Sequence, residues 1–153
     1  MNLFKTFLFA TIATFGFVAC STSQKSMDTS KASAEKIHKA LNNTSWVLKR
    51  IDSQKRDFIA TKDQKELTLN FKDKSYSTSD GCNSQSGDIE IKDNKVAFNS
   101  GISTLRYCGE DMKHLIYSVS IIETKSIEIK DKTLKLKDKN GAVIATYQKK
   151  DAE

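Results

Sequence analysis

The chain of 153 residues has no proline, two histidines, three cysteines and only three arginines. Its one long apolar run lies near the N-terminus, which excludes a protein with several membrane spans. Hydrophobic residues make up 38% and charged residues 29% of the chain, a composition too apolar for a disordered protein. The length fits one ordinary domain rather than two.

The scarcity of cysteine and histidine narrows the chemistry. There is no Cys-x-x-Cys, so neither a thioredoxin-like redox pair nor a zinc knuckle is indicated. A metal site would need Cys82, Cys108 and His114 to meet, and a Cys–His nucleophile would need a free thiol beside His38 or His114. Carboxylates are abundant but fall on turns and polar strand faces. We therefore expect no catalytic residues, no metal and no cofactor.

Residues 1–19 have the pattern of a lipoprotein signal peptide. Lys5 precedes an apolar run from Thr6 to Ala19 that is short for a bilayer span. The run ends in Phe17-Val18-Ala19-Cys20, which resembles a bacterial lipobox. By this resemblance, cleavage follows Ala19 and the Cys20 sulfur carries a diacylglycerol, which anchors the protein to a membrane. The Ser21 that follows favours the outer membrane, with the domain facing the periplasm of a bacterial cell.

A polar segment separates this signal peptide from the folded domain. We interpret residues 20–41 as the lipidated cysteine followed by a flexible tether, because 21–36 are rich in Ser, Thr and Lys. A short helical turn is expected at Ile37–Leu41. The folded domain is then expected over 42–150, a size at which a covalent cross-link helps stability.

Alternation of apolar and charged residues dominates the domain. Turn residues such as Asp73-Lys74 and Asp131-Lys132 separate about eight short alternating segments. One apolar and one charged face per strand is typical of an antiparallel sheet with one solvated side. We therefore predict a mainly β (α+β) fold, a small antiparallel open β-barrel or sandwich. The expected strands centre on Trp46–Leu48, Leu67–Phe71, Ser75–Thr78, Ile89–Ile91, Lys95–Phe98, Ile127–Ile129, Leu134–Leu136 and Val143–Tyr147.

One segment departs from this alternation. Between Glu110 and Thr124, apolar residues recur at helical spacing, and Glu110 and Asp111 suit the positive end of a helix. The spacing predicts one amphipathic helix packed across the sheet. Its apolar stripe consists of Met112, Leu115, Ile116, Val119 and Ile122.

Cys82 and Cys108 remain as an even pair once Cys20 is assigned to lipid. In an exported protein such a pair favours a disulfide. On the loop-entropy model the cross-link would stabilise the fold by roughly 3–4 kcal/mol.

Several segments resemble the META domain family, which includes the HslJ-like heat-shock lipoproteins of bacteria. Gly81-Cys82-Asn83 followed by Gly87 resembles the signature loop of that family, and Thr104 followed by Cys108 resembles its second signature. The opening strand at Trp46-Val47-Leu48 and the closing hairpin around Leu134–Gly141 also match. The resemblance covers residues 42–148.

The resemblance implies a β-rich domain with a helix and no established catalytic residues. It also implies a link to heat or antibiotic stress at the envelope. Gly81 and Gly87 are expected to supply positive φ at tight turns, and Asn83 to bond its own backbone or adopt a left-handed conformation. The loop containing Gly81, Asn83 and Gly87 is either a shaped loop beside the disulfide or a candidate binding loop.

Partners follow from the same observations. We expect a membrane through the lipid on Cys20, and either an envelope protein or a bound lipid. An open barrel could alternatively carry a lipid or a small apolar ligand.

The formal net charge is +6, but lysines alternate with acidic residues and no RNA-binding aromatic motif is present, so nucleic acid is not expected. The best basic patch for anionic headgroups is Lys49, Arg50, Lys55 and Arg56. The positive charge also disfavours an inhibitor of basic lysozymes.

Overall fold

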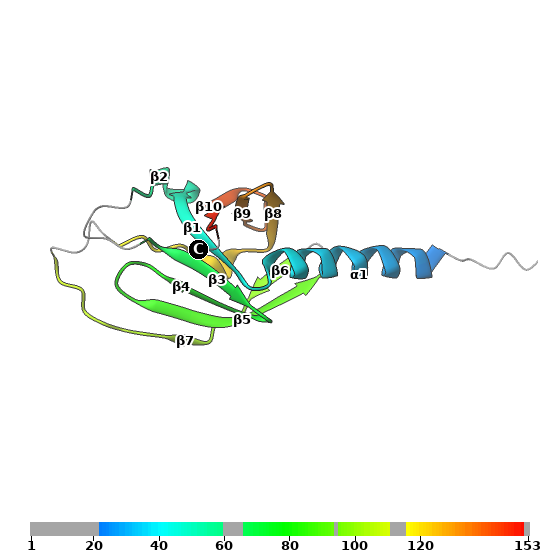
Figure 1. Ribbon diagram of the computed structural model, residues 1–153, viewed down its shortest axis with the longest axis horizontal. Helices are drawn as coiled ribbons and strands as arrows, with labels where there is room; N and C mark the ends of the chain where they lie inside the picture. The colour runs from blue at the N-terminus through cyan, green and yellow to red at the C-terminus, as the bar shows by residue number, and fades with distance from the viewer. Residues whose placement is uncertain (1–21, 60–65, 94, 111–115, 152–153) are drawn as a thin grey trace, which may run out of the picture.

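The computed structural model describes residues 22–59, 66–93, 95–110 and 116–151, with the backbone alone for 22–30. Figure 1 shows a β-rich body from which one helix projects. The elements in chain order are α1 (Thr22–Leu41), β1 (Thr44–Ile51), η1 (Asp52–Gln54), β2 (Arg56–Asp57), β3 (Thr68–Lys72), β4 (Ser75–Ser79), β5 (Ser84–Lys92), β6 (Lys95–Phe98), β7 (Ile102–Ser103), η3 (Ile121–Glu123), β8 (Ser126–Lys130), β9 (Thr133–Lys137) and β10 (Val143–Lys149).

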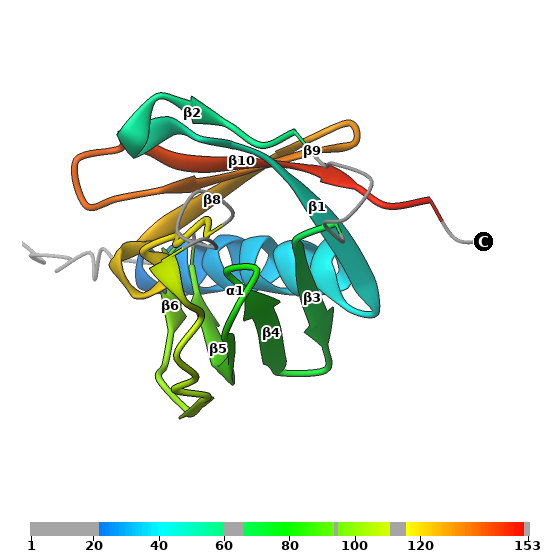
Figure 2. The same ribbon diagram turned by 90° about the vertical axis from the view of Figure 1, so that its left-hand side faces the viewer.

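The strands form one antiparallel sheet that nearly closes into a barrel. Its order is β6-β5-β4-β3-β1-β10-β9-β8, with β2 added to β1 and β7 to β5. In Figure 2, β1, β10, β9 and β8 form one layer and β3 to β6 the other. The end strands β6 and β8 contact each other, and Val96 N in β6 donates to the carbonyl oxygen of Lys125, the residue before β8, at 3.0 Å. The predicted small antiparallel open barrel is therefore confirmed.

The core follows the alternation of the sequence. Leu134 and Leu136 are 0% exposed, while Lys135 between them points outward. Because successive side chains of a strand point to opposite faces, each hydrophobic set lies inside the barrel. The largest interior side chains are Trp46, Tyr76 and Tyr147.

Aspartates shape the hairpins. Asp73, Asp93 and Asp131 adopt positive φ of 53°, 59° and 53°. Aspartate tolerates this left-handed conformation, which two-residue hairpin turns require. The Asp-Lys pairs are thus turn residues, as the sequence predicts.

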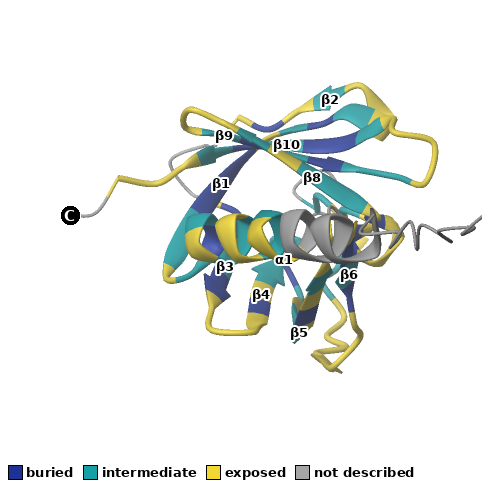
Figure 3. Ribbon diagram, turned by 90° about the vertical axis from the view of Figure 1, so that its right-hand side faces the viewer, coloured by how far each residue is buried: buried dark blue, intermediate teal, exposed yellow. Residues whose placement is uncertain are grey.

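The predicted tether is helical instead. α1 covers Thr22–Leu41, so the expected turn at Ile37–Leu41 is the end of a longer helix. The segment contains neither glycine nor proline, and Ala34, Ile37 and Leu41 lie on one face. Leu41 belongs to the hydrophobic core and is 3% exposed, and Ile37 packs against that core. Figure 3 shows the described part of α1 at one end of the barrel, where α1 contacts β5. None of the helices described combines the length and apolarity that crossing a bilayer requires.

The helix predicted over 110–124 is wrong in the part that the structure describes. Met112 and Leu115 lie outside the described residues, residues 116–120 have no regular structure, and η3 is a single 3-10 turn. The reason is tertiary bonding: Tyr117 N donates to Asp80 O at 2.7 Å, and the Arg56 guanidinium donates to Ile116 O at 2.9 Å. These groups bond neighbouring segments rather than a helix of their own.

Candidate functional site

A disulfide between Cys82 and Cys108 ties two segments together at one end of the barrel. Cys82 lies in the loop between β4 and β5, and Cys108 in the segment after β7; their Cα atoms are 6.1 Å apart. In Figure 1 the β4–β5 loop lies at the end of the molecule opposite the free end of α1. We call the loop 79–83 together with residues 104–108 the clasp.

Asp80 closes the loop of the clasp. Its Oδ1 accepts hydrogen bonds from Cys82 N at 2.8 Å and Asn83 N at 2.6 Å. Asp80 N donates to Asn83 O at 3.0 Å, and Gly81 has φ +100° at the tip. Gly81 therefore supplies the positive φ that the sequence predicts. Asp80 is a residue that the sequence reasoning missed, although Asp before Gly is itself a turn signal.

The Asn83 side chain joins the loop to the segment after β7. Its Oδ1 accepts from Arg106 N at 2.7 Å and from Thr104 Oγ1 at 3.1 Å, while Nδ2 lies 3.4 Å from Arg106 O. The Arg106 guanidinium in turn donates to Cys82 O at 2.9 Å. Asn83 thus bonds across to another segment, and it does not have the left-handed backbone or self-bonding that the sequence predicted.

Gly87 also differs from its expected role. It lies inside β5, and its φ is not among the positive values that Gly81, Gly109 and Gly141 adopt. A Cβ atom there would lie 2.0 Å from the carbonyl oxygen of Asn99. Glycine is needed because the backbone of residues 99–101 crosses β5 at this point.

A pocket of about 170 Å³ opens into the barrel beside the clasp. Asn83 lines it, but Gly81 and Gly87 are not among its described lining residues, so the structure brings only one of the three candidate loop residues to it. Burial raises the pKa of Tyr147, which therefore stays neutral. The other lining residues are Leu48, Leu67, Thr78, Ser79, Asp80, Ser84, Gln85, Ser103, Tyr117, Ser118 and Val119.

A larger and more apolar groove, of about 480 Å³, lies between α1 and β5. Ala34 and His38 line it from the helix, and Ile89 and Ile91 from the strand. Charged side chains stand at its edges. The groove could hold an apolar chain.

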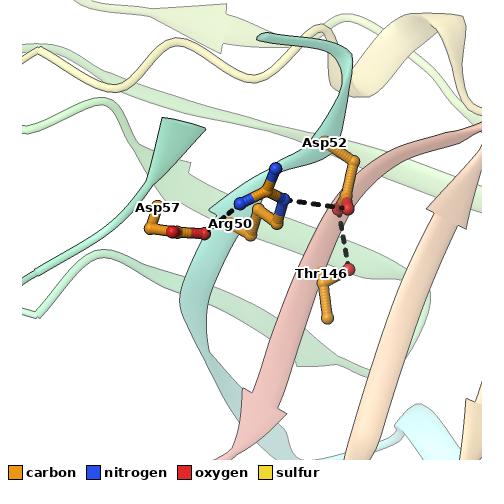
Figure 4. A network of polar contacts seen from close by, with 4 residues as sticks. All are labelled: Arg50, Asp52, Asp57 and Thr146. Atoms are coloured by element: carbon orange, nitrogen blue, oxygen red, sulfur yellow. Dashed lines mark hydrogen bonds and ion pairs between the residues drawn. The ribbon is translucent and has the colours of Figure 1, made fainter. Parts of the chain in front are cut away.

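The basic cluster at Lys49, Arg50, Lys55 and Arg56 is partly neutralised. Figure 4 shows Arg50 between Asp52 and Asp57, with Thr146 bonded to Asp52. Arg56 lies over the Tyr117 ring, with its guanidinium carbon 3.8 Å from the ring centroid. Lys49 and Lys55 are exposed, whereas Arg50 and Arg56 are half-buried in these contacts, which weakens this patch as a site for anionic headgroups.

Metal and thiol chemistry find little support within the described ranges. No group of three or more metal-ligating side chains occurs among the residues described there. Cys82 and Cys108 are joined to each other, so neither offers a free thiol. His114 lies outside the described residues.

These features define the chain as a small, nearly closed antiparallel barrel with a disulfide clasp at one end. Residues 39–151 match the META domain, and the chain belongs to the META domain family. A solved protein from Burkholderia xenovorans has a similar fold, with a TM-score of 0.51 and 20% sequence identity over 76% of this chain and 88% of that one. No curated protein matches the chain.

Proposed function

We propose that the protein is a membrane-anchored envelope lipoprotein that supports tolerance of heat or antibiotic stress, or assists another envelope component, without catalysing a reaction. The disulfide of the clasp is the structural observation that supports this best, since such bonds persist in oxidising compartments outside the cytoplasm. Lipid on Cys20 holds the barrel at the outer membrane, facing the periplasm. Cys20 itself lies outside the described residues.

Anchoring is tested by replacing Cys20. In Cys20→Ala we expect the protein to leave the membrane fraction almost completely, because two or three acyl chains supply the binding and the barrel supplies none. The measurement is fractionation with palmitate labelling, and globomycin should block processing of the parent chain. Ser21→Ala is the matched control, which keeps the lipobox and should stay on the membrane. Unchanged membrane association of Cys20→Ala would refute the anchor.

The stress role is tested in the source bacterium. Deletion of the gene is expected to lower survival under heat or an envelope-active antibiotic, and the parent chain to restore it. Cys20→Ala should restore it poorly if the barrel acts at the membrane. If the deletion strain survived both stresses as well as the strain that keeps the gene, this role would be refuted.

A carrier of lipid or of another small apolar ligand is the second candidate, favoured by the groove between α1 and β5. Native mass spectrometry of residues 21–153, purified without detergent, should then show an adduct that is lost on denaturation. Ala34→Arg would fill the groove and abolish the adduct, whereas Ala32→Arg, exposed on the same helix and outside the groove, should not. A bare protein, or an adduct that persists in Ala34→Arg, would dismiss the groove as a carrier site.

A further inference from the structure

We propose that the pocket beside the clasp binds a small uncharged molecule that carries hydroxyl or amide groups and one apolar face. This inference goes beyond anchoring and stress tolerance and does not depend on them. It rests on polar side chains that face the barrel interior there and that make no hydrogen bond within the described part of the chain.

Tyr147 is the first of these side chains. It is 2% exposed and lines the pocket, yet no hydrogen bond to its hydroxyl is present within the described part of the chain. Among the described residues, the one fully enclosed side-chain oxygen without a partner is Thr124 Oγ1, so the Tyr147 hydroxyl reaches the open space of the pocket. A tyrosine hydroxyl inside a protein usually has a partner. Tyr76, the other large interior tyrosine, donates to Asn99 O at 3.3 Å and does not line the pocket. The difference marks the pocket as the place where the Tyr147 hydroxyl finds its partner.

The register of the sheet adds two more polar groups on the interior face. Thr78 pairs with Leu69, which is 0% exposed inside the barrel, and Gln85 pairs with Thr78. Directly paired residues of antiparallel strands point to the same face. Thr78 and Gln85 therefore occupy positions where the barrel elsewhere has apolar residues, and within the described ranges neither side chain makes a hydrogen bond. Polar residues at interior positions are typical of a functional site rather than of a core.

The lining charges favour an uncharged ligand. No lysine or arginine lines the pocket among the described residues, so none of them offers an anion a counter-ion. Asp80 is the one carboxylate among the lining residues that the structure describes, and two backbone N–H groups already donate to its Oδ1. Leu48, Leu67 and Val119 provide the apolar side of the pocket.

The size excludes a single structural water as the whole explanation. One water needs about 10–15 Å³ of such space, and the pocket of about 170 Å³ offers roughly ten times that. A sugar ring with an N-acetyl group and a short neutral amide share the required chemistry. The two sources are distinguished by using one probe of each kind.

The test is saturation-transfer NMR on the full purified chain in detergent, with N-acetylglucosamine and N-acetylalaninamide as separate probes. At least one neutral probe should give signals that saturate by about 10 mM, as expected for millimolar affinity. Acetate, the charged control, should give none. The probe that binds identifies the ligand as a sugar or an amide.

Tyr147→Phe should weaken binding about two- to tenfold, the usual effect of one hydrogen bond, without lowering the melting temperature. Tyr76→Phe is the matched control and should bind as the parent chain does. If Tyr147→Phe folds poorly, Gln85→Met tests the same pocket through a polar side chain on β5 and should likewise weaken binding. The proposal would be overturned if neither neutral probe gave a saturation-transfer signal, or if acetate gave a stronger signal than the neutral probes. Unchanged binding in both Tyr147→Phe and Gln85→Met would also overturn it.

Discussion

Removal of the disulfide between Cys82 and Cys108 is expected to lower the free energy of unfolding by about 3.5 kcal/mol. The estimate follows from loop-closure entropy for a sequence separation of 26 residues. Against a typical total of about 5–15 kcal/mol this is a large share. For a domain of this size the melting temperature should fall by about 10–20 °C.

The measurement compares urea unfolding of the parent chain with that of the double variant Cys82→Ala, Cys108→Ala. The parent chain under reducing conditions should match the double variant. Asn83→Ala, with the disulfide intact, separates the hydrogen bonds of the clasp from the covalent bond. Equal midpoints for the parent and double-variant chains would show that the polar contacts of Asn83 alone hold the clasp together.

Removal of the disulfide should also loosen the segment around Arg106, in addition to lowering the stability of the whole domain. Arginine occurs only at 50, 56 and 106, and Arg106 lies in an exposed segment whose backbone is held by Asn83. An arginine-specific protease should therefore cut after Arg106 slowly in the oxidised chain and much faster in the double variant. No change in this cleavage would mean that the disulfide does not order the segment.

The strands were predictable because one face of each is buried. Wherever the sequence alternates, as in Leu134-Lys135-Leu136, a shift by one residue would expose the apolar set, so the pattern specifies the fold. The turns were predictable for a related reason: aspartate tolerates positive φ. This local information sufficed for a mainly antiparallel barrel.

The described part of 110–124 is not an α-helix, because helical spacing of apolar residues indicates burial and does not determine hydrogen bonding. In the stripe predicted over 110–124, Ile122 is 44% exposed, while Ile121, outside the stripe, is 1% exposed. Contacts with Asp80 and Arg56 decide the backbone of residues 116–117, and those partners are distant in sequence. Conversely, the large apolar residues Ile37 and Leu41 of α1 come late in a sequence otherwise rich in Ser, Thr and Lys, so its composition resembles a tether.

The candidate site was predictable only in part. The pairing of Cys82 with Cys108 follows from parity once Cys20 is assigned to lipid, and the turn between β4 and β5 from Gly81. Predicting the pocket requires the pairing register of the strands, because Thr78, Gln85 and Tyr147 come from three different strands. Their polar character at interior positions is visible only once each strand has been assigned its inward face.

Gly87→Ala is expected to destabilise the protein by about 3 kcal/mol or more. The added Cβ would lie 2.0 Å from Asn99 O and 3.1 Å from Tyr76 Cε1. Because the closer atom belongs to the backbone, no side-chain rotation relieves the clash, and the sheet itself must shift. Gly141→Ala is the control: it carries φ +81° but has no atom within 4 Å, so it should cost about 1–2 kcal/mol from backbone strain alone.

The same variant tests how the crossing at Gly87 supports the clasp. A Cβ at Gly101 would meet Ser86 O at 2.5 Å and Gly87 Cα at 2.9 Å, so the two glycines allow residues 99–101 to lie directly on β5 before the chain enters β7. The segment that carries Thr104 and Arg106 starts from this crossing. Gly87→Ala should therefore speed proteolysis after Arg106 even with the disulfide intact, whereas Gly141→Ala should not. Equal cleavage and equal urea midpoints in the two variants would show that the crossing has room for a methyl group and that the disulfide alone positions the segment.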